Sequence, residues 1–168
     1  MNLGELDEAE AVCHQAIKIL PGYVDAYWIL TDIAFRRQDF SSALTHGSNY
    51  LKLLSFYREH RQDFQGIVLY SIEQSQRVEL ILLVSNLFLG RRKASRHVLE
   101  SLLSRTITAE EIADAVFRMI SQIKISWDTL QEIINLFLEV IPHEQLIHER
   151  MELICHNITD SSTEDSHK

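Results

Sequence analysis

Apolar and small residues recur at intervals of three and four positions along most of the chain, and this spacing limits the fold more than any other feature. In residues 5–20 the pattern is carried by Leu6, Ala9, Val12, Cys13, Ala16, Ile17 and Leu20. An α-helix brings residues at this spacing onto one face. The 168 residues include 2 Pro and 5 Gly, too few for the frequent turns of an all-β domain. The sequence therefore predicts an all-α fold of about seven or eight helices.

Turn and capping residues divide the chain into separate predicted helices. Pro21-Gly22 ends the first helix, and Asp39 is suited to cap the third. Thr108 and Glu111 have the spacing of a capping box, and Ser126 is suited to cap the helix that follows. After the first helix, the predicted helices cover residues 24–37, 40–57, 72–89, 92–104, 108–123 and 126–141, with a last helix ending near residue 157.

A period of 34 residues links the first predicted helix to the third. Leu6 and Phe40 are 34 residues apart, and so are Ala9 and Ala43, which are small enough to let two helices cross closely. Self-similarity at a fixed period indicates an array of units that stack on one another. The chain is therefore expected to stack repeated helical units.

The chain resembles the tetratricopeptide repeat family, whose unit is a helix–turn–helix of 34 residues. Residues 3–21 are similar to the later part of one repeat, residues 24–55 to a whole repeat and residues 76–107, after an insertion, to a third. Tyr27 matches the large aromatic residue of the family's first helix. Thr31 stands where the family usually has glycine, so the match is degenerate. The resemblance implies a solenoid of helical hairpins.

This resemblance divides the chain into five predicted parts. They are the repeats over residues 1–57 (the first one incomplete), an insertion or loop over 58–70, a degenerate helical pair over 71–105, a divergent C-terminal helical pair with a capping helix over 106–157 and a disordered tail over 158–168. The chain begins inside a repeat. We therefore expect either an internal start at Met1 or another subunit or domain over the exposed face of the first helix. A homodimer through this N-terminal face is one such arrangement.

In the tetratricopeptide repeat family, the first helices of successive repeats line a concave groove that binds peptides or another domain. The resemblance places five residues of the whole repeat in that groove, namely Asp25, Trp28, Asp32, Phe35 and Arg36. The looser third unit would add Arg77, Leu80, Val84, Leu87 and Phe88. Trp28 and Asp32 stand where the family's carboxylate clamp has lysine and asparagine, so capture of a peptide's terminal carboxylate is not expected.

Trp28 and Phe35 leave two interpretations open. They are seven residues apart and so lie two turns apart on one face of a helix. They either form a strip that binds an apolar helix or peptide, or pack in the core against the neighbouring repeat or the insertion over 58–70.

Charge and hydropathy argue against nucleic acid and membranes as partners. The chain has 16 Lys and Arg against 24 Asp and Glu, a net charge of -8, which disfavours nucleic acid and anionic membrane surfaces. The most apolar stretch, residues 78–89, is shorter than the roughly 20 residues that a membrane span needs. The N-terminus lacks the apolar segment of a signal peptide, and 2 Cys do not make a disulfide framework. We expect a cytoplasmic protein that is not inserted in a membrane.

No residue pattern indicates catalysis or a metal site. His143 and His148 are five residues apart, so a helix would point their imidazoles about 140° apart. The glycines are isolated and form no phosphate-binding loop, and no Gly-x-Ser-x-Gly elbow occurs. The basic cluster of Arg91, Arg92, Lys93 and Arg96 is either a solvated turn or a local anionic contact. We expect no enzyme activity, cofactor or metal, and interpret the chain as a protein–protein interaction scaffold.

A second interpretation makes the chain an accessory region of a larger bacterial enzyme. Residues 50–90 are similar to the helical region attached to some bacterial glycosyltransferases. The similarity depends on the run YLKLL at 50–54 and the segment YSI at 70–72.

Overall fold

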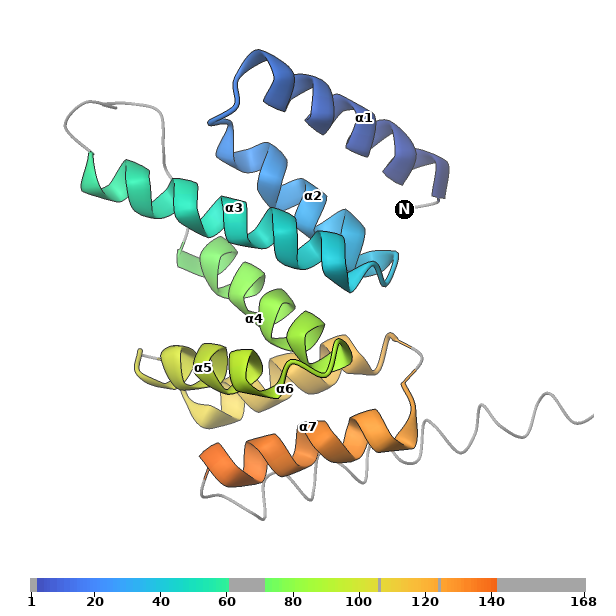
Figure 1. Ribbon diagram of the computed structural model, residues 1–168, viewed down its shortest axis with the longest axis vertical. Coiled ribbons are helices and arrows are strands. Elements are labelled where there is room, and N and C mark those ends of the chain that lie inside the picture. Colours follow the sequence, from blue (N-terminus) through green and yellow to red (C-terminus); the bar gives the residue numbers. More distant parts are fainter. Residues whose placement is uncertain (1–2, 61–71, 106, 124, 142–168) are drawn as a thin grey trace, which may run out of the picture. The chain divides into compact units, whose positions relative to one another are not determined.

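A computed structural model describes residues 3–60, 72–105, 107–123 and 125–141 (Figure 1). These ranges contain seven helices and no strand, which confirms the all-α prediction. The helices are α1 (Leu3–Ile19), α2 (Val24–Arg36), α3 (Phe40–Glu59), α4 (Ile72–Phe88), α5 (Arg92–Leu103), α6 (Ala109–Ile120) and α7 (Trp127–Val140). The predicted last helix and tail lie outside the described residues. Most of the insertion predicted over 58–70 also lies outside them, and its first residues belong to α3, which continues to Glu59.

The chain forms two compact units, Met1–Leu89 and Gly90–Lys168. The division falls inside the helical pair predicted over residues 71–105. In the first unit α1 packs against α2, α2 against α3 and α3 against α4, and α2 also packs against α4 (Figure 1). Helix α2 therefore contacts three other helices, and its sides are covered more fully than those of an edge helix.

Two apolar clusters form the core of the first unit. Between α1 and α2, Cys13 packs with Ala26 and Leu30. A larger cluster joins α2, α3 and α4 and contains Val24, Leu44, Tyr50, Leu54, Val78 and Leu82. Ala43, Gly47, Tyr50, Leu51 and Leu54 follow a helical spacing along α3, and all of them are buried except Leu51, which is half-buried.

Gly47 lies where α3 packs tightly against α2 and α4. A Cβ atom at this position would lie 2.8 Å from Leu82 Cδ2 and 3.3 Å from both Thr31 Cγ2 and Val78 Cγ1. The Thr31 hydroxyl donates a hydrogen bond to the Tyr27 carbonyl at 2.7 Å within α2. The absence of a side chain at Gly47 therefore leaves room for the methyl group of a buried threonine on the facing helix.

The predicted caps are present in both units. The Asp39 carboxylate accepts a hydrogen bond from the Ser42 amide at 3.0 Å at the start of α3. At the start of α6, the Thr108 amide donates to Glu111 Oε2 at 2.9 Å and the Glu111 amide donates to Thr108 Oγ at 3.2 Å, which completes a capping box. These bonds satisfy amides that the first turn of a helix leaves without partners.

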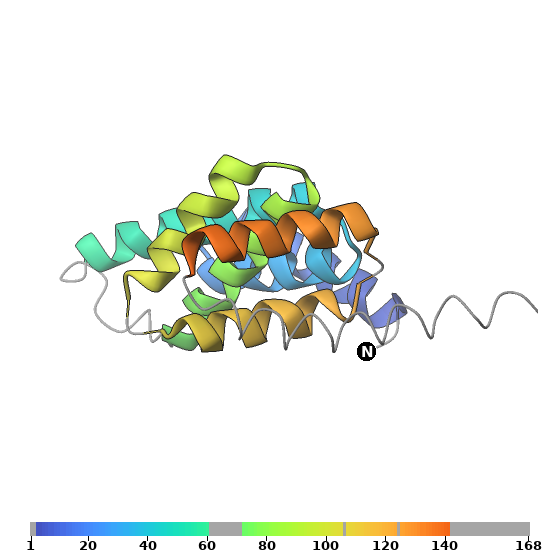
Figure 2. The same cartoon turned by 90° about the horizontal axis from the view of Figure 1, so that it is seen from below.

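In the second unit, α6 and α7 run antiparallel (Figure 2), and α5 packs against α7. Phe117 of α6 and Phe137 of α7 have ring centroids 5.9 Å apart. Ile112, Val116, Ile120, Leu130, Ile134 and Phe137 recur at helical spacing along the two helices and are buried, whereas Met119, Ile123 and Leu138 are half-buried. Trp127, which continues the same spacing, is 54% exposed because it is the first residue of α7. Among the described helices, none combines the length and apolarity needed to cross a membrane.

Candidate partner-binding face

The five predicted groove residues all lie on α2, but the structure gives them different environments. Asp25, Trp28 and Asp32 are half-buried, Arg36 is exposed and Phe35 is buried. We use the term α2–α4 face for the surface that Asp25, Trp28, Asp32 and Arg36 form together with Arg77 of α4.

Asp32 is the centre of a charge cluster that joins α2 to α4. Arg36 Nε donates to Asp32 Oδ2 at 2.6 Å, and Arg77 Nη2 donates to Asp32 Oδ1 at 2.7 Å. The Asp32 side chain is 15% exposed, whereas those of Arg36 and Arg77 are 48% and 51% exposed. A guanidinium group has several N–H donors, and each of these two arginines uses one of them on Asp32. The cluster therefore presents two half-exposed cations around one shielded carboxylate.

Trp28 belongs partly to the core and partly to the surface. Its ring packs against the larger apolar cluster that joins α2, α3 and α4. Its Nε1 atom is buried and has no hydrogen-bond partner within the described part of the chain. A buried donor without an acceptor is costly, so the apolar contacts of the ring must hold the indole in place.

Phe35 lies in the core. It is 8% exposed, and its ring meets that of Phe40 edge-on at a centroid distance of 6.0 Å. Phe40 in turn stacks on Phe88 at 4.5 Å. This aromatic row ties α2, α3 and α4 together, so the position of Phe35 agrees with the packing interpretation. The row also includes Phe88, one of the residues predicted for the third unit.

The other residues predicted for the third unit also divide into buried and exposed ones. Val84 and Leu87 are buried, and Leu80 is half-buried. Arg77 is the exposed member, and the structure brings it to Asp32. The sequence offers no local signal for this pair, because the two residues are 45 positions apart. In the sequence, only the opposite charges of Asp32 and Arg77 on two predicted groove helices favour such a pair.

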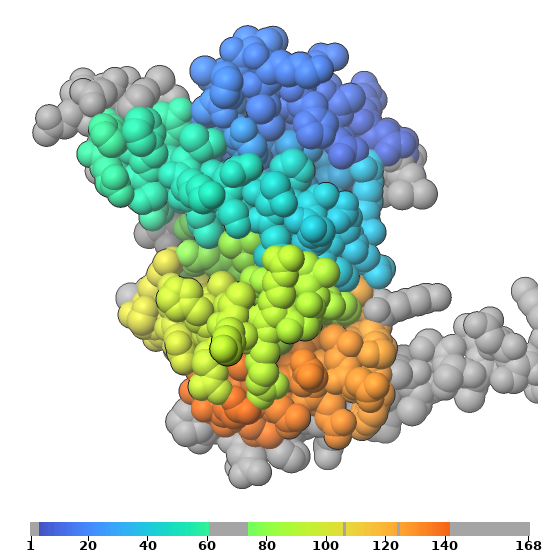
Figure 3. Space-filling view, viewed as in Figure 1, coloured from blue at the N-terminus to red at the C-terminus, as the bar shows by residue number. Residues whose placement is uncertain are grey.

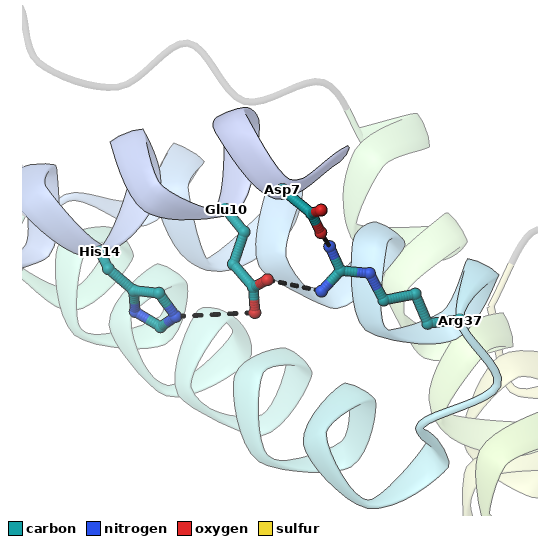
Figure 4. A network of polar contacts seen from close by, with 4 residues as sticks. All are labelled: Asp7, Glu10, His14 and Arg37. Carbon is teal, nitrogen blue, oxygen red and sulfur yellow. Dashed lines mark hydrogen bonds and ion pairs between the residues drawn. The ribbon is translucent and has the colours of Figure 1, made fainter. Parts of the chain in front are cut away.

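A second polar network fixes α1 to the end of α2 (Figure 4). Arg37 Nη1 donates to Glu10 Oε2 at 2.5 Å, and Arg37 Nη2 donates to Asp7. His14 Nε2 lies 3.8 Å from the other Glu10 oxygen. The hydrogen bond to Glu10 raises the pKa of Arg37, with smaller contributions from the charges of Glu10 and Asp7. The bonds of Arg37 have no local sequence signature, since they join residues 27 and 30 positions apart, whereas Glu10 and His14 are an i, i+4 pair within α1.

The basic cluster after Gly90 makes an internal anionic contact. Arg92 and Arg96 of α5 both donate hydrogen bonds to Glu139 of α7. Two of the four basic side chains are thus paired within the second unit.

Nothing in the described ranges indicates a catalytic or metal centre. No three His, Cys, Asp or Glu side chains converge there in a way that could hold a metal ion. Cys13 is a buried free thiol whose pKa is raised, first by burial and then by the charge of Glu10, so it stays protonated. Cys155, His143 and His148 lie outside the described residues.

Comparison with known proteins found no matching family model, no similar curated protein and no similar solved structure.

Proposed function

We propose that this chain is a non-catalytic interaction scaffold that works in the cytoplasm. In this proposal it is built from tetratricopeptide-like hairpins and binds a peptide, a helix or a partner domain on the α2–α4 face. Helices α2 and α3 form one repeat, α1 is the second helix of the preceding repeat and α4 is the first helix of the next. A second copy of the chain, docked on the exposed face of α1, is a further candidate partner.

The observation that carries the proposal is the contact between α2 and α4. Helix α2 packs against α3, α3 packs against α4, and α2 also reaches α4 directly. First helices of consecutive hairpins meet in this way when the hairpins stack. The Asp32–Arg77 hydrogen bond joins the two helices. The side chains of Arg36 and Arg77 remain about half-exposed, and Trp28 of α2 is half-buried.

The chemistry of this face suits protein recognition. Arginine and tryptophan are the residue types that most often dominate the binding energy of protein interfaces. Arg36 and Arg77 can each bind a further carboxylate or carbonyl while they hold Asp32. The two arginines also offset the negative charge of Asp32, which by itself would repel a carboxylate ligand. We therefore assign the central role to Arg36 and Arg77 rather than to Phe35.

Site-specific photo-crosslinking in cells tests this proposal. A benzophenone amino acid at position 36 or 77 should give the same covalent adduct, identified by mass spectrometry. The same probe at Thr45, an exposed residue of α3, should not give it. Loss of the pair with Asp32 should change the melting temperature little, because exposed ion pairs contribute about 0–1 kcal/mol. Identical adducts at all three positions, or none at positions 36 and 77, would contradict the proposal.

The accessory-region alternative makes a different prediction. The run at 50–54 supplies Tyr50 and Leu54 to the core, and Leu51 and Leu53 are half-buried against it. Helix packing thus accounts for the pattern without reference to a glycosyltransferase. An immunoblot of host extract with antibodies to this chain decides between the two. A band that matches 168 residues favours the scaffold, and a much larger band favours the accessory region.

A further inference from the structure

Two histidines meet where α1 contacts α3. The rings of His14 on α1 and His46 on α3 lie edge to face, with centroids 6.2 Å apart. His46 is half-buried, and its Nδ1 atom is buried without a hydrogen-bond partner among the residues that the structure describes. His14 is half-exposed, and its Nε2 lies 3.8 Å from Glu10 Oε1. His46, the less accessible of the two rings, therefore has a buried nitrogen that lacks a hydrogen-bond partner among the described residues.

Helix α1 depends on a small number of contacts. It lies at the outer edge of the first unit (Figure 3), and the described part of its core side has two fully buried apolar residues, Leu6 and Cys13. Its polar attachment is the Arg37 network with Asp7 and Glu10. Edge elements with few buried contacts open locally before the rest of a protein unfolds. A change of charge at the α1–α3 contact can therefore act on this helix alone.

We propose that the His14–His46 contact is a pH-sensitive latch, which holds α1 on the first unit when both imidazoles are neutral and releases it when His46 gains a proton. A protonated His46 would place a partly buried cation, whose Nδ1 has no hydrogen-bond acceptor among the described residues, against the ring of His14. Release of α1 would return His46 to water and expose the Ala26 and Leu30 surface of α2, which α1 covers through Cys13.

The charged groups around His46 do not cancel this effect. Glu10 of α1 and Asp39 at the start of α3 both favour the protonated ring. Each carboxylate already accepts another hydrogen bond. Glu10 accepts one from Arg37, which follows the last residue of α2, and Asp39 accepts one from the Ser42 amide. Burial, and after it the proximity of His14, outweigh them and lower the pKa of His46 from its ordinary value.

The direction of the pH effect follows from this shift. A histidine whose pKa is lowered by docking binds fewer protons when α1 is docked than when it is released. The docked form therefore has its full stability above the ordinary pKa of about 6.5, and loses it as the pH falls toward the lowered value. Within that window the released population rises by up to about tenfold per pH unit.

Hydrogen exchange of the whole chain at about pH 7.5 and about pH 5.5 tests the latch. Rates are divided by those of an unstructured peptide at the same pH. The amides of α1 should lose protection at the lower pH, by several-fold or more, while those of α3 and α4 keep theirs. In His46→Gln, which cannot gain a proton, α1 protection should be the same at both values. His97→Gln, at an exposed position of α5, is the matched control and should behave like the wild type.

Two results would overturn the latch. One is α1 protection that does not change with pH in the wild type, and the other is a loss that persists in His46→Gln. If His46→Gln fails to fold, an NMR titration of the wild-type imidazole replaces it. A pKa below about 6.5 for His46, with α1 amide signals shifting in the same titration, supports the latch. A pKa at or above that value overturns it.

Discussion

Arg77 of α4 donates a hydrogen bond to the carboxylate of Asp32 on α2 at 2.7 Å, across 45 residues of sequence. Arg36 donates to the other oxygen of the same carboxylate from one turn further along α2. One aspartate therefore positions two arginines, one on each helix of the α2–α4 face. The arrangement makes the face depend on the tertiary packing of α2 against α4.

The first prediction is that Asp32 and Arg77 are energetically coupled. A double-mutant cycle with Asp32→Asn and Arg77→Gln should give a coupling free energy of about 0.2–1 kcal/mol, since half-exposed pairs lie in this range. Chemical denaturation at low salt is the measurement. The same cycle with Asp32 and Lys52, an exposed residue of α3, should give no coupling. Equal values for the two cycles would show that the pair does not act in solution.

The second prediction concerns Phe35, whose ring is 8% exposed against Phe40. Phe35→Ala should lower the free energy of unfolding by about 3–5 kcal/mol, because it removes a buried ring and leaves a cavity. Phe56→Ala provides the control, since that ring is 46% exposed and its loss should cost much less. Similar destabilisation by the two variants would mean that Phe35 is a surface residue and would restore the binding-strip interpretation.

The third prediction concerns the close approach at Gly47. Gly47→Ala adds a Cβ atom 2.8 Å from Leu82 Cδ2, beside the buried Thr31 and Val78. Overpacking costs about 1–3 kcal/mol and exceeds the gain of up to about 1 kcal/mol from replacing glycine in a helix. Thermal unfolding should therefore show a lower midpoint. Thr45→Ala, at an exposed position of the same helix, should leave the midpoint nearly unchanged. A higher midpoint for Gly47→Ala would show that α3 can move away from its neighbours.

The fourth prediction concerns the capping box of α6 and the loss of stability in acid. Hydrogen bonds from the Thr108 amide and hydroxyl lower the pKa of the Glu111 carboxyl from its ordinary value of 4.5. A lowered carboxyl pKa contributes stability that is present above the ordinary value and is lost as the pH falls through the lowered one. The wild type should thus lose stability as the pH falls below the ordinary value of 4.5, and Glu111→Gln should lose less.

Glu110→Gln is the matched control for this acid series. Glu110 is also exposed in the first turn of α6, but it is not the residue that completes the capping box. Its replacement should leave the acid loss of the wild type in place. Thr108→Ala should lower stability by about 0.5–2 kcal/mol at neutral pH. An acid profile that is identical in Glu111→Gln and the wild type would show that the capping carboxylate does not contribute.

The features that the sequence predicts correctly are local ones. Asp39, Thr108 and Ser126 each cap a helix through an amide three residues away, so a short sequence window contains the whole interaction. In α4, which is buried on most sides, the polar Asn86 likewise donates to the Leu82 carbonyl within the same helix.

The features that the sequence does not predict depend on which helices meet. Phe35 and Trp28 share one spacing along α2, yet Phe35 is in the core and Trp28 is only half-buried. The difference arises because α2 contacts α1, α3 and α4, and these cover its faces unequally along its length. The Asp32–Arg77 and Glu10–Arg37 pairs likewise join residues on separate helices, where no periodicity applies.

Affinity for the partner identified by crosslinking tests the central claim most directly. Isothermal titration calorimetry would compare the wild type with Arg36→Glu and Arg77→Glu on the α2–α4 face, and with Thr45→Glu and Lys52→Glu on α3. The scaffold account predicts that each arginine reversal weakens binding by about tenfold or more, equivalent to about 1.4 kcal/mol, while the α3 variants bind like the wild type. Unchanged affinity in both arginine variants, with folding intact by circular dichroism, would contradict it.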